Sequence, residues 1–266
     1  MGSSCFVRSP TTAQQPIPTG DRAARVFDRI GLDSARWRVG AVVAAGYVCV
    51  VVVGVLVGTA VEAADGVLFD EADFMVALSA DRSALMTDAS VLFGRFSDTW
   101  TVIGMASGAI IVLSLFRLGR QMVVLGGGLA VELAAYLTIT YLVGRPRPSV
   151  DATASFPSTP SFPSGHVAAA VVLYGAMAIV VWSLDSSRSL RAGAVVVAVV
   201  IPSLVGVSRV YEGLHYPSDV AAGAVLGACC LMVAVIAASQ VPVRTTPCDP
   251  VTASDTATRA RSGASS

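Results

Sequence analysis

The residues best suited to chemistry are the chain's only two histidines, His166 and His215. Asp219 follows His215 by four residues, and Pro217 between them favours the start of a helix there. From the first turn of that helix a carboxylate can reach back to one imidazole nitrogen, which fixes the tautomer and leaves the other nitrogen free to attack or to accept a proton. Only this adjacent Asp219 favours His215 over His166 as a nucleophile.

The residues around the two histidines suit the binding of an anion. Ser164 and Gly165 precede His166 where a helix is expected to begin, so Ser164 can cap that helix and its free N–H groups can point at a ligand. Arg147 and Arg209 offer planar guanidinium groups that match phosphoryl oxygens. The combination is typical of a phosphate site.

The segments that carry these residues are embedded in a strongly apolar chain. Of 266 residues, 54% are hydrophobic and only 14% are charged, with a mean hydropathy of +0.71. Six apolar runs approach the ~20 residues that cross a bilayer, near 39–60, 99–116, 121–143, 167–184, 192–208 and 219–240. We therefore predict an all-α bundle of six transmembrane helices over 39–242, after a cytoplasmic segment 1–38 and before a disordered cytoplasmic tail 243–266.

Arginines set the expected orientation, since the chain has no lysine and cytoplasmic loops are enriched in cations. They precede the first run, lie between the second and third and between the fourth and fifth, and follow the sixth, whereas loop 61–98 carries eight acids and two arginines. Both termini should then be cytoplasmic, with loops 61–98, 144–166 and 209–218 on the outer face of the plasma membrane. All the polar clusters described above fall on that outer face.

Two segments outside the spans have amphipathic patterns. Residues 21–31 place arginines opposite apolar side chains, which suits a helix on an anionic cytoplasmic leaflet. Residues 71–96 predict one or two outer helices, either resting on the bilayer near a lipid entrance or forming an ordinary lid. Residues 1–38 contain no apolar run of the kind that a signal peptide requires.

Other features narrow the function class. A net charge of zero gives no basic field for binding nucleic acid, and the five cysteines form no C-x-x-C pair, so a metal or redox site is not expected. Glu132 lies inside the third run; an acid there is a functional candidate, but its distance from the outer end favours a buried structural role.

The clusters together resemble the type 2 phosphatidic acid phosphatase family, which shares its core with vanadium haloperoxidases. The family pattern P-S-G-H is complete at residues 163–166, and S-R-x5-H-x3-D is complete from Ser208 to Asp219. The pattern K-x6-R-P matches at Arg147 and Pro148, but Thr140 stands in place of the lysine. The resemblance covers roughly residues 90–240.

The resemblance implies roles for these residues. His215 would attack phosphorus and form a phosphohistidine, Asp219 would orient it, and His166 would protonate the leaving oxygen and then activate water. The phosphoryl oxygens would be held by Arg147, Arg209, Ser164 and the backbone at Gly165. Arg145 is the candidate to supply the charge that is missing at Thr140. No metal or other cofactor is implied, because arginines and a helix end supply the positive charge.

The predicted function is that of a membrane phosphatase acting on a lipid phosphate or diphosphate, with phosphatidic acid, phosphatidylglycerol phosphate and polyprenyl diphosphate as candidate substrates. Its partners would be that lipid and the bilayer, and the sequence leaves the oligomeric state open. The alternatives are a headgroup phosphotransferase, a non-catalytic lipid-phosphate-binding protein, and a transporter with Glu132 as a proton relay.

Overall fold

The structure, a computed structural model, describes residues 20–64, 70–153, 159–184 and 186–242, with side chains from residue 34 onward. All regular elements in these ranges are helical, which confirms the all-α class. They are α1 Gly20–Ala64, α2 Glu71–Ala80, α3 Ala84–Gly94, the 3-10 turn η1 Arg95–Ser97, α4 Thr99–Leu115, α5 Gly119–Met122, the π-helical turn η2 Val123–Gly127, α6 Gly128–Val143, α7 Gly165–Ser183, α8 Arg188–Tyr211 and α9 Pro217–Ser239.

Five of the six predicted spans are helices long and apolar enough to cross a membrane: residues 34–64 of α1, the continuous α5–η2–α6 segment 119–143, and α7, α8 and α9. The second predicted span, α4, has only 17 residues. It passes the same test jointly with residues 84–97, from which it is bent by 41°. The fifth predicted span, 192–208, is longer at both ends in the structure, where α8 is one helix of 24 residues that includes Pro202.

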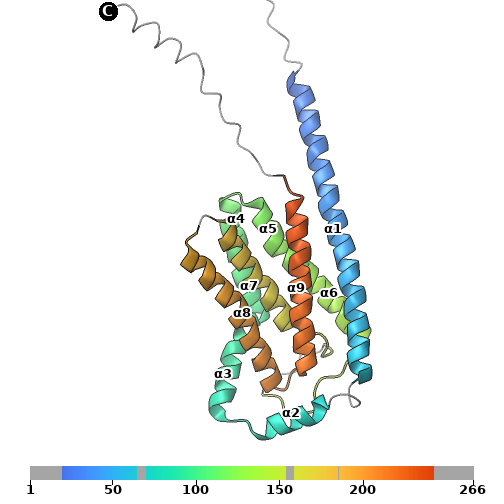
Figure 1. The fold of residues 1–266 in the computed structure, drawn as a ribbon, viewed down its shortest axis with the longest axis vertical. Coiled ribbons are helices and arrows are strands. Elements are labelled where there is room, and N and C mark those ends of the chain that lie inside the picture. The colour runs from blue at the N-terminus through green and yellow to red at the C-terminus, as the bar shows by residue number, and fades with distance from the viewer. Residues whose placement is uncertain (1–19, 65–69, 154–158, 185, 243–266) are drawn as a thin grey trace, which may run out of the picture.

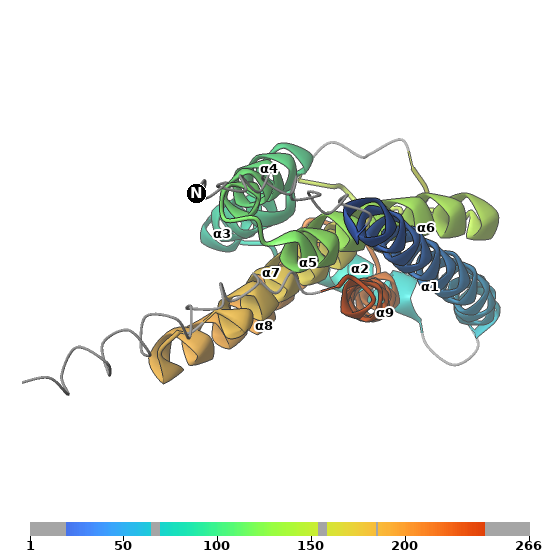
Figure 2. The same ribbon diagram turned by 90° about the horizontal axis from the view of Figure 1, so that it is seen from above.

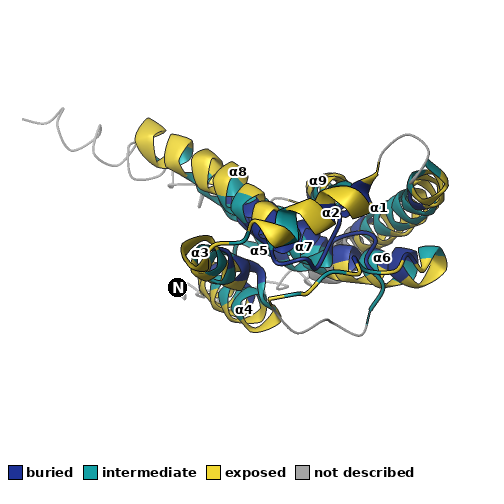
Figure 3. Cartoon of the chain, turned by 90° about the horizontal axis from the view of Figure 1, so that it is seen from below, coloured by how far each residue is buried: buried dark blue, intermediate teal, exposed yellow. Residues whose placement is uncertain are grey.

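The spans stand side by side with α7 at the centre, as Figures 1 and 2 show. Eight residues of α7 are buried, more than among the described side chains of α1 and α4 at the periphery of the bundle. One core cluster joins α7 to α4 and the α5–η2 segment, and a second joins it to α6 and α9. Seen from the end that α2 crosses, this buried interior lies beneath the exposed surface helices (Figure 3).

Small residues let α9 approach the backbone of α7. A Cβ atom on Gly223 would lie 2.4 Å from the carbonyl oxygen of Ser164, and one on Gly227 would lie 2.6 Å from that of Ala168. The close approach fits the general use of small residues where membrane helices pack, because lipid provides no hydrophobic drive for helix association. It also brings the first turns of α7 and α9 together, where the Ser164 N–H donates to the Asp219 carbonyl oxygen over 3.0 Å.

Residues 71–96, for which one or two helices are predicted, contain α2 and α3, which begin at caps formed by Asp70 and Ser83. In Figure 1, α2 lies across the end of the bundle opposite the start of α1 and the end of α9. The three motif segments of the sequence, at residues 147–148, 163–166 and 208–219, meet at the α2 end of the bundle. Helix α1 includes 21–31 without a break before the first span; the predicted amphipathic face of 21–31 and the tail 243–266 fall outside the described side chains.

Candidate active site

Three chain segments converge at the α2 end of the bundle: the segment after α6, the N-terminus of α7 and the turn between α8 and α9. Two glycines with left-handed backbone make the sharp reversals. Gly144 (φ 72°) ends α6, and Gly213 (φ 80°) lies in the turn before α9. A residue with a Cβ adopts this conformation at a cost, so glycine is suited to both positions.

His215 is buried at 2% exposure and is held through its Nδ1 atom. Nδ1 lies 2.8 Å from the backbone oxygen of Ser161, which can only accept, so Nδ1 carries the proton and Nε2 is free. The Asp219 carboxylate is 3.8 Å from Nδ1, a distance for charge interaction rather than a hydrogen bond. The sequence predicts contact between Asp219 and the imidazole; the structure adds Ser161 as the hydrogen-bonding partner. Burial lowers the pKa of His215; Asp219 acts against this lowering, and the nearby Arg147 adds to it.

Asp219 is completely buried and accepts hydrogen bonds from several sides. One oxygen accepts from the Ser161 hydroxyl and from the Tyr216 N–H over 2.9 Å, and the other accepts from Arg145 over 2.8 Å. The Tyr216 bond is half of a capping box that starts α9, with Pro217 in the first turn as predicted. The local helix start therefore fixes the carboxylate beside His215.

His166 lies in the first turn of α7 and faces His215. The two ring centroids are 6.4 Å apart and the ring planes are inclined by 65°. Within the described part of the chain His166 makes no hydrogen bond, so both of its ring nitrogens are available to a ligand.

Arg147 lies beside the free nitrogen of His215. Its Nη1 atom is 3.5 Å from His215 Nε2 and donates to the Leu214 carbonyl oxygen over 2.7 Å. Its Nε atom donates to the Thr159 carbonyl oxygen over 3.0 Å. These bonds hold the guanidinium at the edge where a phosphoryl group would meet His215.

Arg209 is also close to the site but is largely occupied. Its Nη atoms donate to Glu212, to the Gly94 carbonyl oxygen and to Asp98 at 2.8–3.0 Å. Its buried Nε atom has no hydrogen-bond partner among the described residues. Burial raises the pKa of Glu212, although its ion pair with Arg209 acts against this. Arg209 thus ties the end of α8 to the end of α3 and to the residue before α4, and leaves Nε as its open donor.

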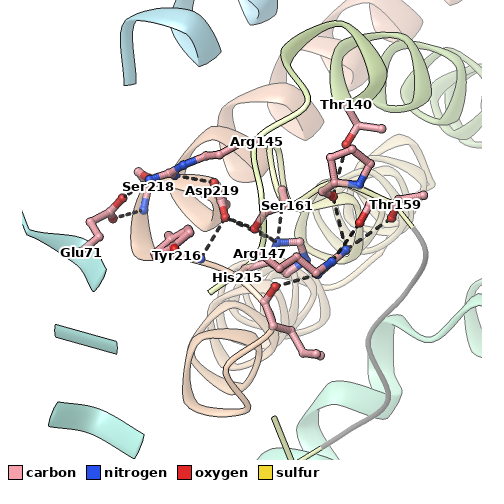
Figure 4. A network of polar contacts seen from close by, with 12 residues as sticks. Glu71, Thr140, Arg145, Arg147, Thr159, Ser161, His215, Tyr216, Ser218 and Asp219 are labelled. Atoms are coloured by element: carbon pink, nitrogen blue, oxygen red, sulfur yellow. Dashed lines mark hydrogen bonds and ion pairs between the residues drawn. The ribbon is translucent and has the colours of Figure 1, made fainter. Parts of the chain in front are cut away.

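Arg145 occupies a different place from the one that the sequence suggests. Its guanidinium is 2% exposed and donates to Asp219 and Ser218 over 2.8 Å and to Glu71 of α2 over 3.0 Å. It also lies 4.3 Å from the centre of the Tyr216 ring. Figure 4 shows Arg145 between Glu71 and Asp219, on the side of Asp219 away from Arg147. This position argues against direct compensation for the missing lysine.

The remaining predicted residues lie near the N-terminus of α7. Ser164 is the N-cap residue, but its side chain makes no capping bond, and its buried hydroxyl has no partner among the described residues. Gly165 permits a close approach of the Tyr136 ring, since a Cβ there would lie 2.8 Å from it. Thr140, where the resemblance expects lysine, is completely buried and donates to the Pro160 carbonyl oxygen over 3.4 Å.

A cleft of about 610 Å³ leads away from His166 between α4, α6 and α7. Its site end is lined by His166, Gly165 and Thr159, and Glu132 lines it farther along α6. Exposed apolar residues such as Ile103 and Leu133 form its edges. The cleft therefore connects His166, which faces His215, with the apolar surface of the bundle.

Sequence reasoning missed several residues of the site. Glu71, Ser161 and Glu212 hold the predicted residues in place, although none belongs to a motif position that marks chemistry. Ser161 lies two residues before the P-S-G-H run, which is the one local signal. Glu71 is 74 residues from Arg145 and was recognisable only as one of the eight acids of loop 61–98.

Comparison with known proteins agrees with this geometry. A profile of the family described as the PAP2 superfamily matches residues 121–241. The decaprenylphosphoryl-5-phosphoribose phosphatase of Mycobacterium tuberculosis is 35% identical over 169 residues, which cover 59% of this chain and 85% of that protein. The protein of the same name from Mycolicibacterium smegmatis is 31% identical over 153 residues, covering 54% and 74%.

The fold is similar to that of a solved membrane phosphatase. The PAP2-type phosphatidylglycerolphosphate phosphatase of Bacillus subtilis aligns with a TM-score of 0.65 at 19% identity, covering 75% of this chain and 98% of that one. The likeness at this identity concerns the fold, whereas the relatives above establish the kinship. The apolar helices, the two facing histidines and these relatives lead to one conclusion: the chain belongs to the PAP2 superfamily and is a multi-pass membrane phosphatase.

Proposed function

We propose that this protein removes phosphate from a membrane lipid through a phosphohistidine on His215. The observation that carries the proposal is the pairing of His215 with His166 at 6.4 Å, with His215 Nε2 unprotonated and Arg147 beside it. An activated nucleophile facing a second imidazole is the arrangement that a two-step displacement requires.

In the first step His215 Nε2 attacks phosphorus while the bond from phosphorus to the lipid oxygen breaks, and protonated His166 gives its proton to that oxygen. In the second step His166 takes a proton from water, the water oxygen attacks phosphorus, the P–N bond breaks, and inorganic phosphate leaves. Asp219, 3.8 Å from Nδ1, stabilises the positive charge that His215 carries in between. Arg147, Arg209 Nε, Ser164 and the Gly165 N–H are the donors for the phosphoryl oxygens.

The relatives support a proposal for the substrate class. Two proteins named decaprenylphosphoryl-5-phosphoribose phosphatase share 31–35% identity with this chain. A substrate with a sugar phosphate head and a polyprenyl chain suits a cleft that has both polar and apolar walls. We infer that this protein hydrolyses the phosphate monoester of a polyprenyl-linked sugar phosphate, on the outer side of the plasma membrane.

The reaction needs no metal ion in this proposal. Guanidinium groups and the N-terminus of α7 supply the positive charge that would otherwise come from a cation. Among the described residues, no group of three or more His, Cys, Asp or Glu side chains could hold a metal ion.

The test is phosphate release by the detergent-solubilised protein from a panel of lipid phosphates, with and without EDTA. We expect release that EDTA leaves unchanged and that falls by about 10³-fold or more in His215→Ala. In His166→Ala the phosphoenzyme should accumulate as an acid-labile species on His215. Ser203→Ala, an exposed position on α8, is the matched control. Equal release by wild type and His215→Ala would refute the mechanism, and strict dependence on added metal would refute metal independence.

A further inference from the structure

Glu132 is the buried acid that the mechanism above does not use. It lies on α6 at 4% exposure, and across the described ranges it makes no hydrogen bond and no ion pair. The sequence favours a structural role for it, away from the site. The structure instead places its side chain on the wall of the cleft that begins at His166.

The position of Glu132 relative to the phosphate site can be judged along α6. Tyr136, one helical turn nearer the site, packs against Gly165 and bonds through its hydroxyl to Thr159. Four residues of helix advance by about 6 Å, so Glu132 lies roughly one sugar unit deeper in the cleft than Tyr136. A ligand whose phosphate contacts His166 would bring to Glu132 the group that follows its phosphate.

The opposite wall of the cleft carries a second polar group, on an exposed residue of α4. Ser107 of α4 lines the cleft, and its hydroxyl makes no hydrogen bond within the described part of the chain. The surrounding lining is apolar, consisting of Val102, Ile103, Ala106, Ile110, Leu129, Leu133 and Ala169. Two unpaired polar groups in apolar walls mark a place where a ligand brings polar atoms.

The chemistry of a carboxyl group limits what it can recognise. A buried carboxyl without a partner is unfavourable, and a plain hydrocarbon chain beside it would leave it unpaired. A hydroxyl group satisfies it, because either protonation state of the carboxyl can accept a hydrogen bond. A site built to pair with hydroxyl groups discriminates strongly against an analogue that lacks them.

We propose that Glu132 determines specificity by binding hydroxyl groups of a sugar or polyol that joins the phosphate to the lipid chain, with Ser107 on the facing wall. This inference rests on the proposed lipid phosphatase function and extends it to the linker. It assigns Glu132 to substrate selection and leaves phosphoryl transfer to the histidines.

The experiment compares two lipids of equal chain length, a prenyl monophosphate and a prenylphosphoryl-ribose 5-phosphate. Glu132→Leu should lower kcat/KM for the ribose lipid by about 100-fold and leave or raise that for the prenyl monophosphate, whereas Glu132→Gln should keep most of the activity on both. Glu62→Leu, an exposed acid on α1 outside the cleft lining, should change neither value. Unaltered hydrolysis of p-nitrophenyl phosphate and an unaltered melting temperature would show that Glu132→Leu folds.

Binding of non-hydrolysable phosphonate analogues of both lipids is measured in parallel. If wild type hydrolyses neither lipid, the proposed function fails, while a preference for the ribose phosphonate that Glu132→Leu abolishes would still support the inference. An equal loss on both lipids, or no loss on the ribose lipid in either assay, would overturn the role of Glu132.

Discussion

The residues proposed to react are held in place by other residues that the motifs do not contain. His215 is oriented by the Ser161 carbonyl oxygen, Asp219 by Arg145, and Arg145 by Glu71 of the surface helix α2. Removing one member of a buried ion-pair network leaves an uncompensated charge, which is costly. The position of the proposed nucleophile is therefore expected to be sensitive to residues outside the proposed substrate contacts.

Arg145 provides the first test of this dependence. Arg145→Gln should lower kcat by about 10- to 100-fold with little change in KM, since a small displacement of Asp219 and His215 has that scale of effect. Arg145→Lys should restore part of the rate. Steady-state kinetics on one lipid phosphate measure kcat and KM for both variants. Arg191→Gln, at the end of α8 away from the site, is the control. An increase in KM at unchanged kcat would return Arg145 to the phosphate pocket that the sequence suggests.

The protonation of His215 is the second test. Burial lowers its pKa, so the imidazole should stay neutral as the pH falls through 6.5, the ordinary histidine value, and should become protonated only below it. Nitrogen-15 NMR of histidine-labelled protein can measure this directly, since the sequence holds two histidines. His166→Gln assigns the spectrum. We expect the tautomer with Nδ1 protonated at pH 7; an imidazolium or the Nε2-protonated form would contradict the geometry.

At the scale of elements, the contact between α7 and α9 aligns the two halves of the site. Gly223→Ala should lower thermal stability and activity together, because the new Cβ would meet the Ser164 carbonyl oxygen at 2.4 Å and push the helix starts apart. Overpacking of this kind costs about 1–3 kcal/mol. Gly104→Ala on α4, where a Cβ meets nothing within 4 Å, is the matched control and should be neutral. Thermal unfolding in detergent and phosphate release provide the measurements.

The bend between α3 and α4 could not be predicted from the sequence. Hydropathy predicts a short second span. In the structure this span, α4, is preceded by the helical segment 84–97, and the two are bent by 41° relative to each other. The junction is fixed by contacts from distant parts of the chain, since Arg209 bonds to Gly94 and Asp98 on either side of η1. No local pattern in residues 84–115 carries that information.

For the whole molecule, the structure supports a testable orientation. The start of α1 and the end of α9 lie at one end, and the site lies at the other (Figure 1). With arginines at the first end, a fluorescent protein fused after Gln240 should fluoresce in the cytoplasm, and an export-dependent alkaline phosphatase fused after Asp81 should be active. An alkaline phosphatase fusion after Leu118 serves as the cytoplasmic control. Activity of the phosphatase at Leu118 but not at Asp81 would reverse the orientation.

The sequence by itself determined which segments form the bundle and which residues are candidates for the chemistry. Apolar runs of spanning length predict the helices, because a bilayer demands such runs. Motif spacing selects His166, His215 and Asp219, because a helix start brings residues four apart onto one side. These inferences depend on local geometry and on the solvent, both of which a linear sequence encodes.

Only the tertiary structure decided how the remaining groups are used. It assigned Arg145 to Asp219 and Glu71, placed most of the Arg209 donors on Glu212, Gly94 and Asp98, and put Glu132 on the cleft of His166. The sequence does not distinguish these polar residues, and most of their partners, Glu212 excepted, lie far away along the chain. Which charge meets which is set by the packing of distant helices, and no spacing rule expresses that packing.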